Sequence, residues 1–156
     1  MATGAPRSHA SEVISSFTGK YRFLSNFYQC EIRFDGNTYP SSEHAYMAAR
    51  THDVELKERF QNPTELSAGQ AKRLGRSLVL RDDWEEVKDQ VMFDILCAKF
   101  SKSDLRELLD STGSAILIEG NTWGDVYWGE CPIGTGRNQL GITLMSIRDH
   151  TMWQLL

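Results

Sequence analysis

The chain has 156 residues, of which 17 are Lys or Arg and 21 are Asp or Glu, so its formal net charge is −4 with histidine neutral. This length favours one domain with a real hydrophobic core. Hydrophobic residues make up 40% of the chain and charged residues 24%, which argues against disordered and low-complexity classes. The mild acidity disfavours extended binding along a nucleic-acid duplex, but it is compatible with one nucleotide held in a pocket.

The apolar stretches, the first residues and the cysteines of the chain indicate its expected place in the cell. The longest aliphatic stretch, residues 115–118, is far shorter than the ~20 residues that a membrane helix needs. The start, MATGAPRSHASEVISS, has no apolar signal core, so we expect a cytoplasmic or nuclear location and no membrane partner. We expect a flexible tail over residues 1–16 and a domain over 17–156. Three cysteines without CxxC spacing favour reduced thiols, and four scattered histidines predict no metal site.

The first half of the chain predicts a hairpin followed by helices. Residues 30–39, CEIRFDGNTY, alternate apolar and polar side chains around a turn at Asp35-Gly36. Residues 40–43, PSSE, are a helix start, and alanines follow at helical spacing. Residues 62–65, NPTE, predict a second helix start with Asn62 as its cap, and Gly75 is the expected end of that helix.

The second half predicts the longest helix and the most irregular loops. Asp82-Asp83 is expected to cap a core helix that runs to about Phe100, and Ser103 a shorter helix that stops at Thr112-Gly113. Residues 115–119 and 126–128 predict two short strands joined by the loop GNTWGD, and a last helix covers about 140–148. Five or six helices around a few short strands define a compact, mainly helical α+β domain.

The first candidate site lies at the start of the helix after residue 40. With Ser41 as the cap, Glu43 lies in the first turn, where the helix dipole favours an ionised carboxylate. Such a group can stabilise a developing cation or act as a base, and it suits a general acid only if burial raises its pKa. Glu43 is also the type of residue that ordinary helix starts contain. His44 is expected to be a packed or surface residue, and Ser25-Asn26 a turn.

The second candidate site is the stretch GNTWGDVYWGEC. Asp125 is flanked by Trp123 and Trp128, and aromatic faces stack on bases or sugars while a carboxylate polarises a hydroxyl or a water molecule. The alternative interpretation is a hairpin turn whose two tryptophans belong to the core.

The third candidate site is IGTGRNQLG. Its three glycines with Asn138, ahead of a helix, are typical of a backbone cradle for phosphate, although a flexible loop fits equally well. Lys72, Arg73 and Arg76 form a basic patch, for which a solvated helix face is the simpler interpretation.

Six motifs in order extend from about residue 17 to residue 150. They are FLSNFYQCEI, YPSSEHAYMAAR, AKRLGR, DW with VMFDILCAKF, IEGNTWGDVYWG, and GRNQLG followed by LMSIRDH. Together they resemble the NADAR family, also called YbiA-like. The resemblance implies a compact, mainly helical YbiA-like fold and N-glycosidase activity. Some members cleave early intermediates of riboflavin synthesis, and others remove ADP-ribose from guanine bases of nucleic acid.

The resemblance also implies site residues. Glu43 in the SEH motif is the expected catalytic carboxylate, with Asp125, Trp128-Gly129 and Asn138 as its neighbours. Arg50 stands where many members have Lys. Lys20 precedes the first motif, and its amine could in principle attack the sugar's C1 and form an imine.

Cleavage of a ribosyl C–N bond passes through oxocarbenium-like charge at C1, which a nearby carboxylate stabilises. In our mechanism, Glu43 stabilises that charge or activates water, Asp125 orients ribose hydroxyls or water, and Trp128 packs on the sugar or base. The Gly-rich loop, Arg22 and Arg76 hold phosphate oxygens, and no metal or cofactor is required. The expected substrate-binding residues are Arg22, Asn26, Arg76, Trp123, Trp128, Gly129 and Asn138.

For the substrate we favour ADP-ribosylated guanine in nucleic acid, contacted as a single modified nucleotide. The chain reads as a lone domain without a fused riboflavin-pathway enzyme, and the adduct would use both the stacking aromatics and the phosphate-binding groups. Two alternatives stay open: an N-glycosidase acting on early riboflavin intermediates, and a non-catalytic module that binds ADP-ribose or NAD.

Overall fold

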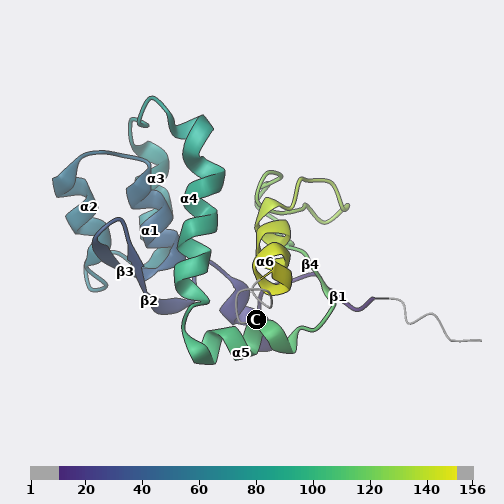
Figure 1. Cartoon of the computed structure of the whole chain (residues 1–156). Helices are drawn as coiled ribbons and strands as arrows, with labels where there is room; N and C mark the ends of the chain where they lie inside the picture. Colours follow the sequence, from purple (N-terminus) through teal and green to yellow (C-terminus); the bar gives the residue numbers. More distant parts are fainter. Residues whose placement is uncertain (1–10, 151–156) are drawn as a thin grey trace, which may run out of the picture.

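The computed structural model describes residues 11–150. This range contains six α-helices, one 3₁₀ helix and four short strands, and the strands form two separate two-stranded sheets (Figure 1). The helices are η1 (Gly19–Leu24), α1 (Ser42–Ala49), α2 (Val54–Gln61), α3 (Ala68–Ser77), α4 (Trp84–Lys99), α5 (Ser103–Ser111) and α6 (Gln139–His150). The strands are β1 (Val13–Ile14), β2 (Gln29–Phe34), β3 (Asn37–Ser41) and β4 (Ile116–Leu117). This content confirms the predicted helix-rich α+β class.

The β2–β3 hairpin forms as predicted and leads directly into α1. The strands are antiparallel, and Ile32 lies opposite Tyr39 with both side chains buried. Asp35 and Gly36 have φ values of 51° and 76°, the left-handed backbone that a tight hairpin turn requires. Because Ser41 ends β3 and also caps α1, the hairpin fixes the position at which α1 begins.

Helix α1 is the central element, and all eight of its residues are buried. It packs against α2, α3, α4 and the hairpin. Gly75 of α3 faces Met47 of α1 so closely that an added Cβ would overlap with the Met47 side chain. The sequence predicts Gly75 as a helix end, but the residue lies inside α3 and permits this close contact.

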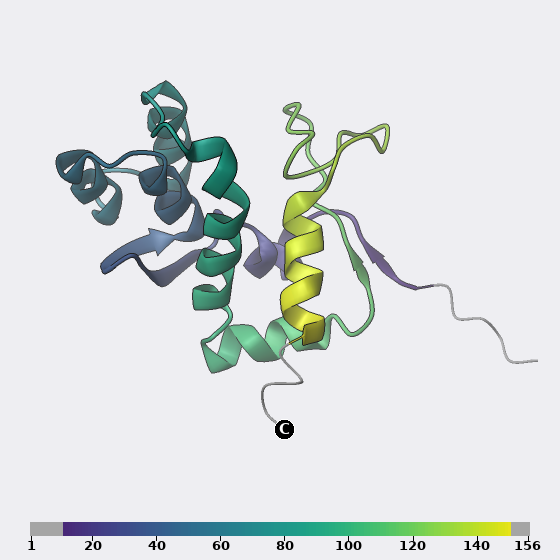
Figure 2. The ribbon, with the colours of Figure 1, turned by 45° about the horizontal axis from the view of Figure 1, so that its top comes forward.

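Helix α4 is the predicted core helix and begins after Asp83. It contacts β2 and α1 as well as α6, and Figures 1 and 2 both show α4 and α6 side by side with α5 crossing at one end. The loop between β4 and α6 lies at the opposite end, beside the N-terminus of α6 (Figure 2). Helix α5 ends at Thr112 and Gly113, as predicted. Among residues 11–150, no helix is both long enough and apolar enough to cross a membrane.

The flexible tail predicted for the start of the chain includes residues that are part of the folded domain. Val13 and Ile14 form β1, which pairs in parallel with Ile116–Leu117 of β4. Ile14 and Phe17 are buried, so their apolar side chains hold this segment on the domain. The flexible tail predicted for residues 1–16 is therefore wrong for residues 13–16. Residues 1–10 lie outside the described part of the chain.

Two further predictions need correction. The NPTE segment forms a turn in which Asn62 Oδ1 accepts from Thr64 N, and α3 begins only after Ser67, whose capping box with Gln70 is the stronger start signal. Helix α2, which precedes this turn, was not predicted. Residues 126–128 form no strand: the N–H groups of Tyr127 and Trp128 donate to the side chain of Asp125 in a local turn instead of to a neighbouring strand.

Candidate active site

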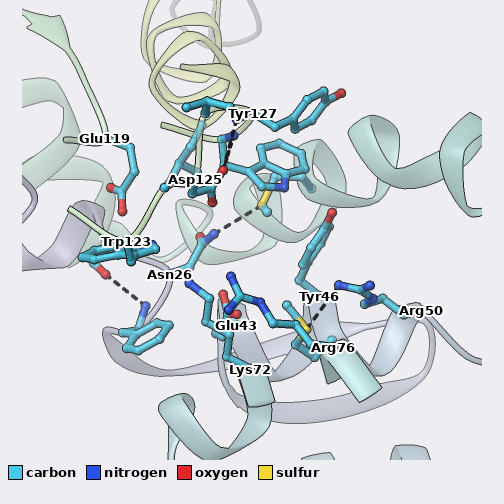
Figure 3. A pocket seen from close by; sticks show the side chains of 18 residues that line it. Asn26, Glu43, Tyr46, Arg50, Lys72, Arg76, Glu119, Trp123, Asp125 and Tyr127 are labelled. Atoms are coloured by element: carbon cyan, nitrogen blue, oxygen red, sulfur yellow. Dashed lines mark hydrogen bonds between the residues drawn. The ribbon is translucent and has the colours of Figure 1, made fainter. Parts of the chain in front are cut away.

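A cavity of about 450 Å³ lies where α1, α3, α4 and the loop between β4 and α6 meet (Figure 3). Figure 3 shows Glu43 beside Asn26 on one side, facing Asp125, Glu119 and Trp123 on the other. The lining residues are Ser25, Asn26, Phe27, Glu43, Tyr46, Met47, Arg50, Lys72, Arg76, Met92, Glu119, Trp123, Gly124, Asp125, Val126, Tyr127, Trp128 and Leu140. Six of the predicted site residues, Glu43, Asp125, Asn26, Arg76, Trp123 and Trp128, thus share one cavity.

Glu43 is held rigidly at the first turn of α1. Its backbone N–H donates to the Asn26 carbonyl at 2.9 Å, and its side chain is 6% exposed. Its Oε1 atom is buried without a hydrogen-bond partner. Burial raises the pKa of the Glu43 carboxyl to about 7, although Lys72 and Arg76 oppose the shift. Burial therefore outweighs the nearby positive charges, and Glu43 can exchange a proton near neutral pH.

Asp125 organises the opposite wall of the cavity. Its Oδ1 accepts from the backbone N–H groups of Trp128 at 2.9 Å and Tyr127 at 3.2 Å. Asn121 holds the Asp125 backbone through both amide atoms of its side chain. One carboxylate oxygen of Asp125 is thus committed to the loop, and the side chain still lines the cavity.

Glu119 is a cavity residue that the sequence analysis missed. Its Oε2 atom is buried without a partner. Burial, followed by repulsion from Asp125, raises the pKa of the Glu119 carboxyl to about 7, and Glu43 adds to the repulsion. The residue was assigned only to a predicted strand, yet an acidic residue at a strand end beside a polar loop is a signal that could have identified it.

Gly129 and Asn138 lie behind the cavity wall and position Glu119. Asn138 Oδ1 accepts from the Glu119 backbone N–H at 2.9 Å, and Asn138 Nδ2 donates to the Leu117 carbonyl. A Cβ on Gly129 would overlap with the Glu119 carbonyl oxygen and lie 3.1 Å from Glu119 Cγ. Neither residue lines the cavity, so the structure gives them a positioning role instead of the predicted contact with substrate.

Several backbone N–H groups of the Gly-rich loop are engaged within the protein. The N–H groups of Arg137, Gln139 and Leu140 donate to the carbonyls of residues 126–128, and that of Asn138 donates to the Gly129 carbonyl. These four donors fold the loop against the start of α6 and are not available to a phosphate.

The positively charged wall of the cavity comes from helices α1 and α3. Lys72 and Arg76 lie one turn apart on α3, and Arg50 caps the end of α1. The basic patch is therefore part of the cavity at Lys72 and Arg76, not simply a solvated face. Lys72 Nζ lies 5.7 Å from the Phe27 ring centre and 5.2 Å from that of Trp123.

The aromatic residues divide between wall and rim. The Trp128 ring meets Tyr46 at 5.4 Å and Tyr127 at 5.0 Å between ring centres, both edge to face, so it is a fixed wall. Trp123 is 59% exposed and stands at the rim. Asn26 Oδ1 is buried without a partner and lines the cavity, as a group that contacts substrate would.

Three other residues lie away from this cavity. Arg22 is exposed and lines a neighbouring cavity. Lys20 is exposed, and its amine lies over the Tyr21 ring at 4.9 Å. His44 is packed as expected, since its ring nitrogens contact Ser41 Oγ and the Leu66 carbonyl. In the described range, no three His, Cys, Asp or Glu side chains are grouped to hold a metal ion.

The fold and the cavity define a small helical domain whose pocket combines three carboxyl groups, three cations and stacking aromatics. That chemistry fits a ligand with a sugar, an aromatic base and phosphate. Residues 15–152 match the family model described as the NADAR domain, and the chain belongs to this family. The match confirms the resemblance seen in the sequence motifs.

Relatives and a solved structure agree with this assignment. The chain is 41% identical over 137 residues to N-glycosidase YbiA of Escherichia coli (strain K12), across 86% of this chain and 84% of that protein. It is 39% identical over 130 residues to Riboflavin biosynthesis protein VVA0006 of Vibrio vulnificus (strain YJ016), across 81% of this chain and 35% of that protein. The NMR structure of E. coli YbiA matches with a TM-score of 0.80 and 36% identity, across 99% of this chain and 95% of that one.

Proposed function

We propose that this protein is an N-glycosidase that removes ADP-ribose from ADP-ribosylated guanine in nucleic acid. Its place among the N-glycosidases of the NADAR family follows from the family match and from the names of its relatives. The observation that supports a hydrolytic site best is the pair of buried carboxyl groups, Glu43 and Glu119, each with an unpartnered oxygen at one cavity. Unpartnered buried carboxyl oxygens are costly, and such sites are typical of catalysis.

The two carboxyl groups can divide the chemistry between them. Burial raises the pKa of both carboxyl groups to about 7, so near neutral pH each is partly protonated and either can give or take a proton. Ionised Glu43 stabilises positive charge at the ribosyl C1 and takes a proton from the attacking water. Protonated Glu119 gives its proton to the departing base as the C–N bond breaks. The products are the free base and ADP-ribose with a hydroxyl at C1.

The other walls match the remaining parts of this substrate. Asp125 orients the ribose hydroxyls or the water. Lys72, Arg76 and Arg50 offer positive charge to a diphosphate, and guanidinium groups bind such oxygens through paired hydrogen bonds. Trp123 at the rim gives a base a face on which to stack.

The test compares two substrates with one protein. The purified protein is incubated with a guanine-ADP-ribosylated oligonucleotide and, separately, with early riboflavin intermediates, and the released sugar product is measured. We expect release from the first substrate, and a loss of about 10²-fold or more in kcat for Glu43→Gln. Glu107→Gln, which changes an exposed carboxylate on α5, is the matched control and should keep full turnover.

The riboflavin intermediates are the second candidate substrate, because the Vibrio vulnificus relative is named a riboflavin biosynthesis protein. Release of sugar only from those intermediates would replace the proposed substrate with them. Binding of ADP-ribose without any product, with an affinity that Glu43→Gln leaves unchanged, would instead identify a non-catalytic binding module. Full turnover by folded Glu43→Gln would refute the role of that residue.

A further inference from the structure

A second cavity of about 610 Å³ adjoins the candidate active site. It opens between η1 and the start of β2, and Ser25 and Phe27 line both cavities. Its remaining lining residues are Phe17, Thr18, Gly19, Arg22, Tyr28 and Gln29. A ligand that leaves the first cavity across Phe27 therefore enters the second.

The two cavities differ in charge. The first contains three carboxyl groups as well as its cations, whereas none of the residues lining the second is Asp or Glu. Arg22 is the cation of the second cavity, and its exposed side chain takes part in none of the ion pairs found within residues 11–150. The aromatic rings of Phe27 and Tyr28 lie on the same lining. One free guanidinium beside aromatic rings fits a phosphate attached to a base.

Residues 25–27 separate the two cavities, and hydrogen bonds hold their backbone in place. The Phe27 backbone N–H donates to Ser25 Oγ at 3.1 Å, which closes a tight turn. Beneath it, the Ser25 carbonyl accepts from Nζ of Lys99 at 2.9 Å, and Lys99 is fully buried. On the other side, Lys72 lies over the Phe27 ring. The Phe27 side chain is 43% exposed, so it lies between the two cavities with an accessible aromatic face.

We propose that the second cavity binds the nucleotide next to the ADP-ribosylated guanine on the same strand, with its phosphate on Arg22 and its base against Phe27 or Tyr28. The inference rests on the proposed function. A strand with its modified nucleotide at the first cavity must continue along the surface, and the adjoining cavity is the one that offers positive charge without a competing carboxylate. Aromatic stacking with one cationic contact is how single strands are held without sequence preference.

The test compares a short single-stranded oligonucleotide carrying one ADP-ribosylated guanine with the free ADP-ribosylated guanosine nucleoside. Both contain the whole ADP-ribose group, but only the oligonucleotide has flanking phosphates. We expect Arg22→Gln to lower kcat/KM for the oligonucleotide roughly tenfold, the loss of one charge-assisted contact. The log–log salt dependence should become shallower by about 0.7. The nucleoside has no flanking phosphate, so its kcat/KM should fall far less than that of the oligonucleotide. Arg33→Gln, an exposed arginine outside both cavities, should change neither substrate.

Each other outcome overturns the inference in a recognisable way. An equal loss on both substrates would place Arg22 on the ADP-ribose group itself. No loss on either substrate would show that the second cavity binds no part of the strand. If the unaltered protein hydrolyses neither substrate, the proposed function fails and the inference fails with it.

Discussion

The carboxyl group of Glu43 is placed at a cost in stability. It is 6% exposed, its Oε1 atom has no hydrogen-bond partner, and burial raises its pKa to about 7. In the unfolded chain the same group ionises near 4.5. Between these values the folded protein binds a proton that the unfolded chain has released. The free energy of unfolding therefore falls as the pH rises from about 4.5 to about 7, by roughly 3 kcal/mol at most.

Glu43→Gln should accordingly stabilise the protein above neutral pH while removing activity. An amide cannot ionise, so we expect a gain of about 2–3 kcal/mol in the free energy of unfolding at about pH 8, shrinking to below about 1 kcal/mol at about pH 5. Urea denaturation at the two pH values measures the two gains in the free energy of unfolding, with Glu107→Gln as the control. A gain that does not depend on pH would show that burial does not perturb the ionisation of Glu43.

Glu119→Gln tests the division of roles between the two carboxyl groups. If Glu119 is the acid, wild-type kcat/KM falls at high pH as Glu119 loses its proton, and at low pH as Glu43 gains one. We expect Glu119→Gln to lower kcat about 10²–10⁴-fold and to abolish the fall at high pH, while the fall at low pH stays. If kcat/KM of the variant still falls at both high and low pH, Glu119 is not the general acid. Circular dichroism of the variant checks that it is folded.

Sequence reasoning located the cavity-lining residues best where local chemistry decides. Glu43 was found through its cap and Asp125 through its loop, because both signals lie within a few residues. Glu119 was missed, and Gly129 and Asn138 were assigned to substrate. The places of Gly129 and Asn138 depend on their contacts with residue 119, which no local pattern encodes.

At the scale of elements, the contact between α1 and α3 places the positively charged wall of the cavity. Gly75 gives α3 its close approach to Met47, and Lys72 and Arg76 lie on the same helix. A Cβ at position 75 would lie only 2.7 Å from Met47 Cγ and 2.8 Å from Met47 Cβ. Because Met47 Cβ is fixed to the α1 backbone, relief requires the two helices to separate.

Gly75→Ala should therefore destabilise the protein even though alanine favours helices. We expect a loss of about 1–3 kcal/mol from overpacking, together with a higher KM as the positively charged wall of the cavity moves. Gly69→Ala in the same helix is the matched control: nothing lies within 4 Å of its Cβ, and it should stabilise by up to about 1 kcal/mol. Chemical denaturation of both variants measures the difference. Equal effects from the two substitutions would show that the α1–α3 contact is loose.

The elements that were predicted correctly carry two agreeing local signals. The β2–β3 hairpin has alternation and a turn dipeptide, and α4 has a cap and a long apolar period. Helix α3 was placed too early because Asn62 and Ser67 offer competing start signals, and only Ser67 is completed by a reciprocal partner, Gln70. Strand β1 was missed because its partner lies about a hundred residues away, and pairing over that distance leaves no local trace.

At the scale of the whole molecule, charge is unevenly arranged. The chain has a net charge of −4, yet Lys72, Arg76 and Arg50 gather at one cavity, and Arg22 lies at the next. The composition predicts an acidic protein, and only the fold shows that its substrate-facing cations are concentrated. A protein of this kind attracts one anionic group at a defined place and repels a long polyanion elsewhere.

Unmodified duplex DNA should consequently bind weakly, while the ADP-ribosylated strand is hydrolysed efficiently. Non-specific duplex binders reach a Kd of about 10⁻⁴–10⁻⁶ M at physiological salt by neutralising many phosphates, and we expect this protein to lie at or beyond the weak end of that range. Fluorescence anisotropy with a labelled duplex measures the affinity and its salt dependence. Since few cations contact the strand, lowering the salt concentration should strengthen binding only modestly. A Kd below about 10⁻⁶ M for plain duplex would contradict recognition through one modified nucleotide, because the affinity would then come from the phosphate backbone.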